Sequence, residues 1–280
     1  MIELPESKNL ADQFAKTLKG KSVLNVTANK SPHKFAWFHG NPADYHALLA
    51  GKKVTGSDSF GGMAELQIDD VKLVFCDGTN IRYFCESDSL PQKHQLHIEF
   101  EDFTSMICSV QMYGAMWLLD EKEEEGYYKS SKYKIKPLQP EFDATYFENL
   151  MKNAKQTLSA KAFLATEQRI PGLGNGVLQD ILFNAKIHPK RKLATLTDAE
   201  KQAVYESVTQ TLASMTAGGG RDTEKDIFGV NGGYITKLSA KTQNEPCPVC
   251  GTLIIREAYL GGNIYFCPAC QKIENDKVKK

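Results

Sequence analysis

The stretch LATEQRIPGLGNGVLQDILFNAKIHPKR, residues 164–191, decides the fold. A Pro-Gly-Leu-Gly turn leads to Asn175, which opens a helix with apolar periodicity that ends near Lys186. Asn is a favoured N-cap, and a glycine-rich turn exposes backbone N–H groups at the positive end of the helix dipole, which suits an anion. Taken alone, the same pattern also fits an ordinary capped turn between two helices.

The segments around this stretch predict a chain with three structured parts. Residues 1–120 contain one helical run, ESKNLADQFAKTLKG, and then short β-rich runs that alternate apolar and polar residues, as half-buried strands do. Residues 121–142 are charged, begin with an acidic cluster at 121–125 and contain prolines near their end, which indicates a linker. Residues 143–235 are mainly helical, and residues 236–280 form a small cysteine-rich module. We therefore predict an α+β multidomain protein.

The tail CPVCGTLIIREAYLGGNIYFCPAC predicts a zinc site. Two Cys-x-x-Cys pairs, separated by sixteen residues, supply the candidate ligands Cys247, Cys250, Cys267 and Cys270. The residues between them read as two strands around the turn YLGGN. Because four thiolates fill a tetrahedral site and leave no position for water, we expect one structural zinc ion. The alternatives are two disulfides or four unrelated cysteines.

Composition narrows the class of protein without naming a partner. With 41% hydrophobic and 24% charged residues, the chain is typical of a globular protein, and no apolar stretch has the length of a membrane span. Lys+Arg and Asp+Glu balance at 34 each, which neither indicates nor excludes a nucleic-acid partner. The opening MIELPES has no basic region or long apolar run, so we expect no secretory signal. Seven cysteines with two close pairs favour a reducing compartment, the cytoplasm.

Residues 164–191, the ending FCPACQK and the opening IELPE together resemble the formamidopyrimidine-DNA glycosylase and endonuclease VIII family of base-excision repair enzymes. DYHALLAGKKV and YGAMWLL are weaker similarities. The resemblance spans the chain and implies an N-terminal β-sandwich with flanking helices, a helix–two-turn–helix domain and a zinc finger. It also implies a monomer that binds damaged or distorted double-stranded DNA in a cleft between the domains, close to the nucleoid in a bacterium.

By the same resemblance, several residues of the helical part would contact DNA phosphates. Asn175 and the amides around Gly174 would hold one phosphate, and Lys161 lies in the preceding helix. Lys190 and Arg191 follow the next helix. For the three basic residues, a solvated surface charge is the alternative. Such contacts position DNA without reading its sequence.

The N-terminus departs from the family pattern. In the family, a proline or valine after the initiator methionine attacks the sugar C1′ through its amine, which is nucleophilic near neutrality. Here Ile2 stands at that position, and we expect Met1 to be retained because its removal normally requires a small second residue. The catalytic candidates are therefore Glu3, which the family uses to assist opening of the sugar ring, and the Met1 amine, displaced by one residue. Glu3 has an alternative role as a carboxylate at a helix N-terminus.

Other family positions have changed as well. Gly62 occupies the place of a phosphate-binding lysine, and Gly262 or Asn263 that of a zinc-finger arginine. Met112 and Tyr113 stand where the family fills the void left by a flipped nucleotide, and an apolar wedge is sufficient for that role; for Met112, a core strand position is the alternative. The function implied is damaged-DNA binding with base release, and the alternative is a non-catalytic binder of bent, damaged or abasic DNA.

Overall fold

The computed structural model describes residues 1–120 and 126–273 of the 280-residue chain. These residues form two compact units. The first contains Met1–Tyr133 together with the later segment Gly218–Gly233, and the second contains Lys134–Ala217 and the chain from Tyr234 onward. The predicted acidic cluster at 121–125 lies outside the described residues.

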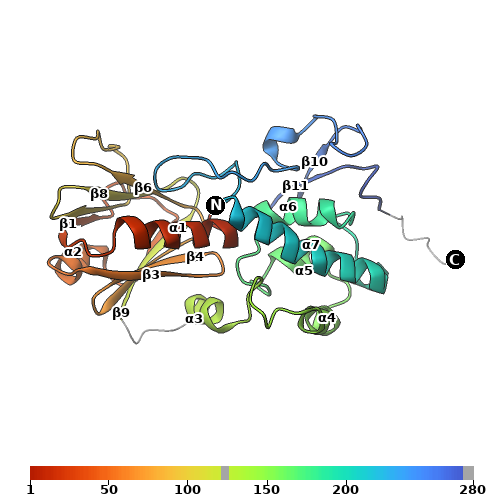
Figure 1. Ribbon diagram of the computed structural model, residues 1–280, viewed down its shortest axis with the longest axis horizontal. Coiled ribbons are helices and arrows are strands. Elements are labelled where there is room, and N and C mark those ends of the chain that lie inside the picture. The colour runs from red at the N-terminus through yellow and green to blue at the C-terminus, as the bar shows by residue number, and fades with distance from the viewer. Residues whose placement is uncertain (121–125, 274–280) are drawn as a thin grey trace. The chain divides into compact units, whose positions relative to one another are not determined.

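Two β-sheets make up most of the first unit (Figure 1). The four-stranded sheet has the order β1-β7-β8-β6 and is antiparallel; its strands are β1 (Val23–Ala28), β7 (Leu96–Phe100), β8 (Ser105–Val110) and β6 (Thr79–Phe84). The five-stranded sheet has the order β2-β9-β5-β4-β3; its strands are β2 (Ala36–Phe38), β9 (Gly114–Asp120), β5 (Val71–Cys76), β4 (Met63–Ile68) and β3 (Val54–Phe60). Within it, β2 and β9 run parallel.

A shared apolar core joins the two sheets into the predicted sandwich. Val23 and Ile98 of the four-stranded sheet lie in one buried cluster with Leu66 and Met116 of the five-stranded sheet. Ile227 belongs to the same cluster, and its carbonyl accepts a hydrogen bond from the Tyr83 amide at 2.8 Å. Burial of Ile227 explains why Gly218–Gly233, which the sequence analysis placed with the helical part, packs with the first unit.

Helix α1 (Leu4–Thr17) confirms the predicted N-terminal helix, and it packs against β3 and β4 (Figure 1). Its apolar side, which includes Leu10 and Phe14, belongs to the sandwich core.

Strand β3 was not predicted because its sequence, VTGSDSF, is polar and contains a glycine. It forms because it pairs with β4 along its length and because Ser57 Oγ donates to the Ala11 carbonyl at 2.7 Å. The short helix α2 (Tyr45–Leu49) was predicted.

Helix α3 (Gly126–Tyr133) lies in the stretch 121–142 that we predicted as a linker. Its Tyr128 is buried with Met63, Val74 and Leu119, and the Tyr128 hydroxyl donates a short hydrogen bond to the buried Glu65. Because these partners come from the sheet, the local sequence contains no signal for this helix.

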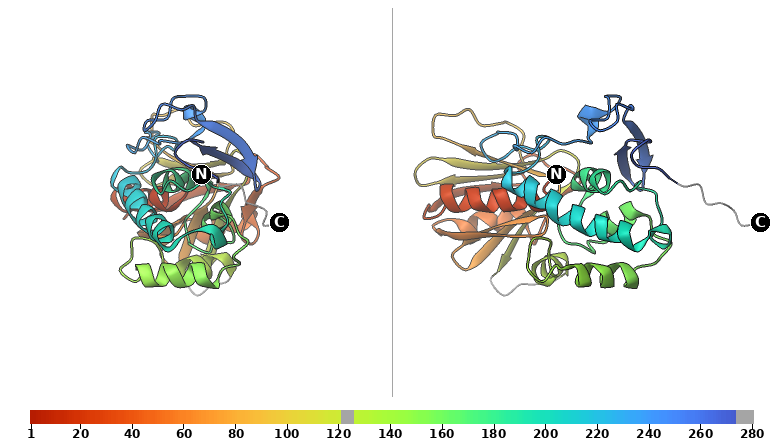
Figure 2. Two further views of the ribbon diagram at one scale, coloured as in Figure 1. Left: turned by 90° about the vertical axis from the view of Figure 1, so that its right-hand side faces the viewer. Right: turned by 45° about the vertical axis from the view of Figure 1, so that its right-hand side comes forward.

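The second unit contains helices α4 (Ala144–Asn153), α5 (Ala160–Ala165), α6 (Asn175–Asn184) and α7 (Asp198–Ala217). Its core includes Phe147, Phe163, Ile181 and Leu212. The hairpin of β10 (Ile255–Tyr259) and β11 (Gly262–Phe266) confirms the predicted ribbon. The hairpin, dark blue in Figure 2, packs against α6. In the described part of the chain, no helix is long and apolar enough to cross a membrane.

Candidate functional site

The N-terminus of α1 gathers buried carboxylates. Glu3 is the N-cap residue and forms a capping box with Glu6, whose carboxylate accepts the Glu3 N–H at 3.2 Å. Glu3 and Glu6 are only 3% and 6% exposed. The predicted alternative role of Glu3, as a carboxylate at a helix N-terminus, is therefore present in the structure.

Arg221, itself 2% exposed, compensates these charges. Its Nε and Nη2 donate to the two Glu6 oxygens, each at 2.9 Å, and its Nη1 lies 3.6 Å from Glu3 Oε2. Burial alone would lower the pKa of Arg221, but the neighbouring carboxylates of Glu3 and Glu6 outweigh it and raise the pKa. Arg221 therefore stays charged and holds Glu3 in place.

Met1 lies beside this buried group. Its amine forms a short ion pair with Glu224, and its carbonyl accepts from Arg221 Nη2 at 3.2 Å. Ile2 is 5% exposed and donates its N–H to the Asp77 carbonyl at 2.8 Å. The residue at the family's nucleophile position is therefore packed into the core by its side chain and bound by its backbone.

Asp77 and Tyr113 complete the surroundings of the N-terminus. Burial raises the pKa of Asp77, although the nearby amine acts in the opposite direction. Burial, with the charges of Asp77 and Glu3, raises the pKa of Tyr113, whose hydroxyl lies 3.8 Å from Met1 Sδ. We predicted Met1, Glu3 and Tyr113 as site residues, and the structure brings them together.

Sequence reasoning missed Arg221, Glu224 and Asp77. The run GGGRDTEKDIFGVNGG indicated only a break after the last helix. The available signal was a lone arginine that follows three glycines. The structure shows why glycines stand there: Gly219 and Gly220 have φ of +70° and +105°, which glycine adopts without strain. In addition, a Cβ at Gly220 would lie 3.4 Å from Glu6 Oε1.

In the second unit, Asn175 has a different role from the predicted cap. Gly174 is the N-cap of α6, and Asn175 is its first helical residue. The Asn175 Nδ2 donates to the Asn263 carbonyl in the ribbon at 3.0 Å, and its Oδ1 is buried without a hydrogen-bond partner among the described residues. Gly174 has no side chain to cap the helix, and the Asn175 side chain, through its amide donor, binds the ribbon.

Lys161 reaches the same point. It is 3% exposed, its Nζ donates to the Tyr259 carbonyl at 2.6 Å, and burial lowers its pKa. A Cβ at Gly262 would lie 3.5 Å from Asn175 Nδ2 and 3.6 Å from Lys161 Nζ. The ribbon position that we aligned with a missing arginine is thus where both predicted phosphate ligands converge.

Lys190 and Arg191 also have protein partners. Lys190 forms a short ion pair with Glu257 of the ribbon. Arg191 donates to both oxygens of Glu200, at 3.0 and 3.1 Å, and to the Thr195 carbonyl at 2.6 Å. Both side chains are therefore paired with residues of the second unit. Neither is the free surface charge that we considered as the alternative.

Met112 and Tyr113 lie in the turn between β8 and β9. Met112 is 73% exposed, so the alternative of a core position is wrong. Gly62 lies at the β3–β4 turn and is buried.

The four predicted cysteines converge on one point. Their sulfurs all lie within 4.8 Å of one another, with separations of 3.9 Å for Cys247–Cys270 and 3.4 Å for Cys250–Cys267. These values match the separation of about 3.8 Å between thiolates bound to zinc at about 2.3 Å, and they exceed the bond length of about 2.05 Å in a disulfide. The donor set fits one structural zinc ion, and the disulfide alternative is wrong.

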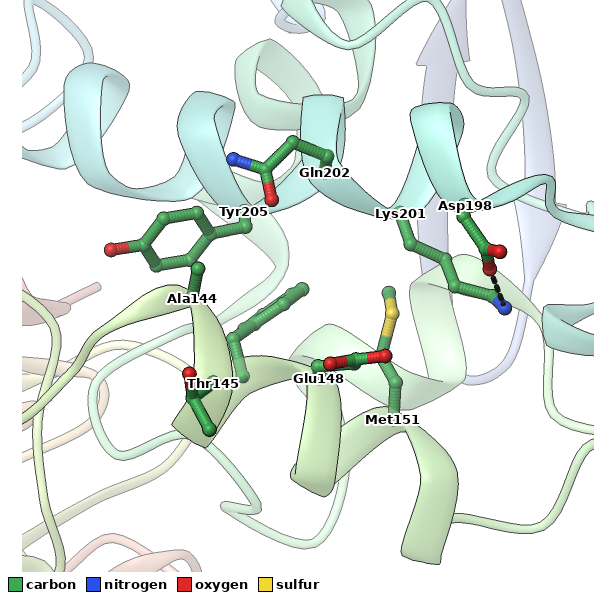
Figure 3. Close-up of a pocket in the computed structure, with 9 residues that line it drawn as sticks. Ala144, Thr145, Glu148, Met151, Asp198, Lys201, Gln202 and Tyr205 are labelled. Atoms are coloured by element: carbon green, nitrogen blue, oxygen red, sulfur yellow. Dashed lines mark hydrogen bonds and ion pairs between the residues drawn. The ribbon is translucent and has the colours of Figure 1, made fainter.

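A pocket of about 270 Å³ lies between α4 and α7 (Figure 3). Its lining includes Phe147, Met151 and Tyr205, together with Asp198 and Lys201, which pair with each other at 2.8 Å. None of the predicted site residues lines it.

Comparison with known proteins agrees with this architecture. Residues 134–225 match the formamidopyrimidine-DNA glycosylase H2TH domain, and residues 244–273 match the zinc finger found in FPG and IleRS. A formamidopyrimidine-DNA glycosylase of Cytobacillus firmus is 25% identical over 97% of this chain and its own full length. One from Wolbachia pipientis (strain wPip) is 29% identical over the same shares.

Solved structures share the fold. The Lactococcus lactis Fpg in complex with DNA containing an abasic site has a TM-score of 0.82 at 24% identity, over 97% of this chain and all of that chain. The MutM (FPG) protein from Thermus thermophilus has a TM-score of 0.80 at 21% identity, over 98% of this chain and all of that chain.

The described units thus define a zinc-finger protein with a β-sandwich and an H2TH domain. The chain is similar over nearly its whole length to formamidopyrimidine-DNA glycosylases and contains the H2TH domain and the zinc finger of those proteins, with Ile2 as its second residue.

Proposed function

We propose that this protein binds duplex DNA that contains a damaged or abasic nucleotide. The observation that carries the proposal is the convergence of the α6 N-terminus, Lys161 and the zinc ribbon in the second unit. The Lactococcus lactis relative, which has the same fold, was solved with abasic-site DNA. The backbone amides of the first turn of α6 would bind a phosphate with Lys161 beside them, and Lys190 and Arg191 would contact phosphates by exchanging Glu257 and Glu200 for DNA oxygens.

The contacts of Asn175 and Lys161 refine this proposal. Each side chain is held by a ribbon carbonyl, so its position depends on the zinc site. We infer that these two residues place the ribbon against the first turn of α6, and that phosphate binding relies on the amides near Gly174 with Lys161 as the nearest cation.

We infer that base release, rather than strand cleavage by a proline amine, is the chemistry of the first unit. Hydrolysis breaks the bond from C1′ to the base nitrogen and forms a bond from C1′ to a water oxygen. Glu3 would accept the proton of that water and stabilise the positive charge that develops on the sugar, while the departing base takes a proton from solvent. Arg221 holds the carboxylate of Glu3, and Tyr113 would fill the space left by the flipped nucleotide.

An attack by the Met1 amine has weaker support. The amine is bound to Glu224, and it lies one residue before the family's nucleophile position. It would have to leave this carboxylate and lose a proton before it could attack C1′.

The test is a panel of duplexes with damaged bases, assayed for base release and for covalent trapping with borohydride. We expect base release without a trapped adduct, and loss of release in Glu3→Gln with duplex binding unchanged. Glu86→Gln, an exposed carboxylate of the same unit, is the control. A trapped adduct that disappears when the N-terminal amine is blocked would contradict hydrolysis by water. The mass of the N-terminal residue would show in the same preparation whether Met1 is retained.

A non-catalytic binder of damaged or abasic DNA is the second candidate. It is favoured by Gly62, and by Gly262 or Asn263, at the positions that we aligned with a lysine and an arginine of the family. Specific binding to an abasic duplex, with neither base release nor a trapped adduct across the panel, would replace the glycosylase proposal with this one.

A further inference from the structure

The first unit carries a row of four aromatic side chains, which we name the aromatic ladder: Phe35 and Trp37 are exposed, and His33 and Tyr113 at its two ends are half-buried. Neighbouring rings lie 6.3 Å apart for His33–Phe35 and 6.4 Å apart for both Phe35–Trp37 and Trp37–Tyr113. Phe35 is 46% exposed and Trp37 is 48% exposed. Large aromatic side chains gain stability from burial, so two neighbouring exposed rings within a row of four indicate a binding surface.

The geometry of the edge strand β2 keeps the ladder out of the core. Successive strand residues point to opposite faces, and here Ala36 and Phe38 pack against the sandwich core while Phe35 and Trp37 face outward. β2 pairs with β9 through Ala36↔Gly114 and Trp37↔Ala115, which places Tyr113 next to Trp37. Trp37 is therefore fixed on a paired strand, and Phe35 precedes it directly, with its carbonyl accepting the Gly114 N–H at 2.9 Å.

The charge around the ladder suits a polyanion. The segment NKSPHKFAWFHG, residues 29–40, contains two lysines and two histidines and has no carboxylate. The Lys34 ammonium lies 5.3 Å from the centre of the Phe35 ring. Aromatic rings beside cationic side chains are the features with which proteins bind single-stranded nucleic acid: bases stack on the rings, and the cations attract the backbone.

The ladder adjoins the N-terminal residues Met1 and Glu3. Its last ring, Tyr113, donates to Met1 Sδ at 3.8 Å, and Met112 beside it is 73% exposed. A DNA strand that led away from Met1 and Glu3 along this surface would therefore pass Tyr113, then Trp37 and then Phe35.

We propose that the aromatic ladder is a stacking platform for the unpaired bases of single-stranded DNA. It extends the void-filling position Tyr113 by three further rings, so that the protein would hold a short unpaired stretch next to a lesion. The inference rests on the proposed function only in taking DNA as the polymer, and oligothymidine tests it without any lesion.

The experiment uses tryptophan fluorescence of the full-length, zinc-loaded protein. The chain contains two tryptophans, and Trp117→Phe leaves Trp37 as the only one. We expect oligothymidine to quench Trp37 fluorescence and the quenching midpoint to rise with salt concentration. Because one base–aromatic stack corresponds to a loss of about 5- to 140-fold, Trp37→Ala and Phe35→Ala should each weaken oligothymidine binding by that order, measured by anisotropy of labelled DNA. Trp37→Phe should restore most of the affinity.

Leu48→Ala is the matched control, because Leu48 lies on α2 of the same unit and is 46% exposed. Unchanged affinity in Trp37→Ala and Phe35→Ala, or no quenching in the wild type, would overturn the ladder proposal while leaving abasic-duplex binding intact. Quenching and ladder-dependent oligothymidine binding, without any preference for abasic duplex, would support the ladder and count against the proposed function. Binding of a protein partner at this face without DNA binding would also overturn the ladder proposal.

Discussion

At the scale of residues, a single arginine organises the N-terminus of this protein. Arg221 contacts Glu6, Glu3, Glu224 and the Met1 carbonyl, and it is almost fully buried. Burying a charge is costly unless it is paired, so the guanidinium and the carboxylates depend on one another. The family's nucleophile has changed to Ile2, whereas the carboxylate of Glu3 remains held in a defined position.

Arg221→Met should lower the free energy of unfolding by about 3–5 kcal/mol, because it leaves buried carboxylates without a counter-charge. Urea unfolding followed by circular dichroism measures this change. Combining it with Glu3→Gln and Glu6→Gln should recover part of the loss, because the uncompensated charges are removed. Arg256→Met, on the exposed side of the ribbon, is the control. A loss in Arg221→Met no greater than in this control would contradict the account.

At the scale of elements, the sequence predicted those parts whose signal is local. The periodicity of α1, the Gly-Leu-Gly turn before α6 and the two cysteine pairs each lie within one short segment. Strand β3 and helix α3 were missed because their partners are distant: β3 depends on pairing with β4, and Tyr128 of α3 depends on Glu65. The predicted cap at Asn175 was wrong by one residue, since Gly174 is the N-cap, and the contact of Asn175 with the distant Asn263 of the ribbon has no local signal.

The zinc ribbon should control the order of the second unit. Removing zinc with a chelator, or replacing Cys250 by alanine, should unfold the β10–β11 hairpin and release Lys161 and Asn175 from its carbonyls. We expect one zinc ion per chain, measured with a metal indicator, and a large loss of DNA affinity that added zinc restores in the chelated wild type. Cys85→Ser, which changes a cysteine outside the cluster, should leave both measurements unchanged. Full DNA affinity in the zinc-free protein would contradict this role.

Helix α7 should carry a measurable pH dependence through its capping box. Glu200 accepts the Thr197 N–H at 2.8 Å, and Thr197 Oγ1 accepts the Glu200 N–H at 3.2 Å. Partial burial raises the pKa of Glu200, but hydrogen bonds from Thr197 and Arg191 outweigh it and hold the pKa below its usual value. The stabilisation is therefore complete above the unfolded pKa, about 4.3, and is lost as the pH falls through the lower folded value.

Glu200→Gln should accordingly lower the free energy of unfolding by about 1 kcal/mol at neutral pH, with a smaller difference in acid. Urea unfolding at two pH values measures this. Glu206→Gln, at an exposed position of the same helix, is the control. If the effect of Glu200→Gln were the same at both pH values, ionisation of Glu200 would not be its cause.

At the scale of the whole molecule, the protein has the architecture of the formamidopyrimidine-DNA glycosylases, and its second residue is Ile2. The H2TH and zinc-finger matches and the shared fold were predictable from motifs spread along the sequence. The protein partners of Lys161, Lys190 and Arg191 were not, because a basic side chain in a sequence does not show whether it faces DNA or an oxygen of its own chain, a backbone carbonyl for Lys161 and carboxylates for Lys190 and Arg191.

The central claim is preferential binding to damaged duplex DNA, and the most direct measurement compares two duplexes of one sequence. One is intact and the other carries a tetrahydrofuran abasic analogue, and affinity is followed by anisotropy over a range of salt concentrations. We predict tighter binding to the abasic duplex, because less stacking energy is lost when it is opened or bent. We also predict weaker binding in Asn175→Ala but not in the exposed control Asn153→Ala. Equal affinity for the two duplexes at every salt concentration, with zinc bound, would contradict the account.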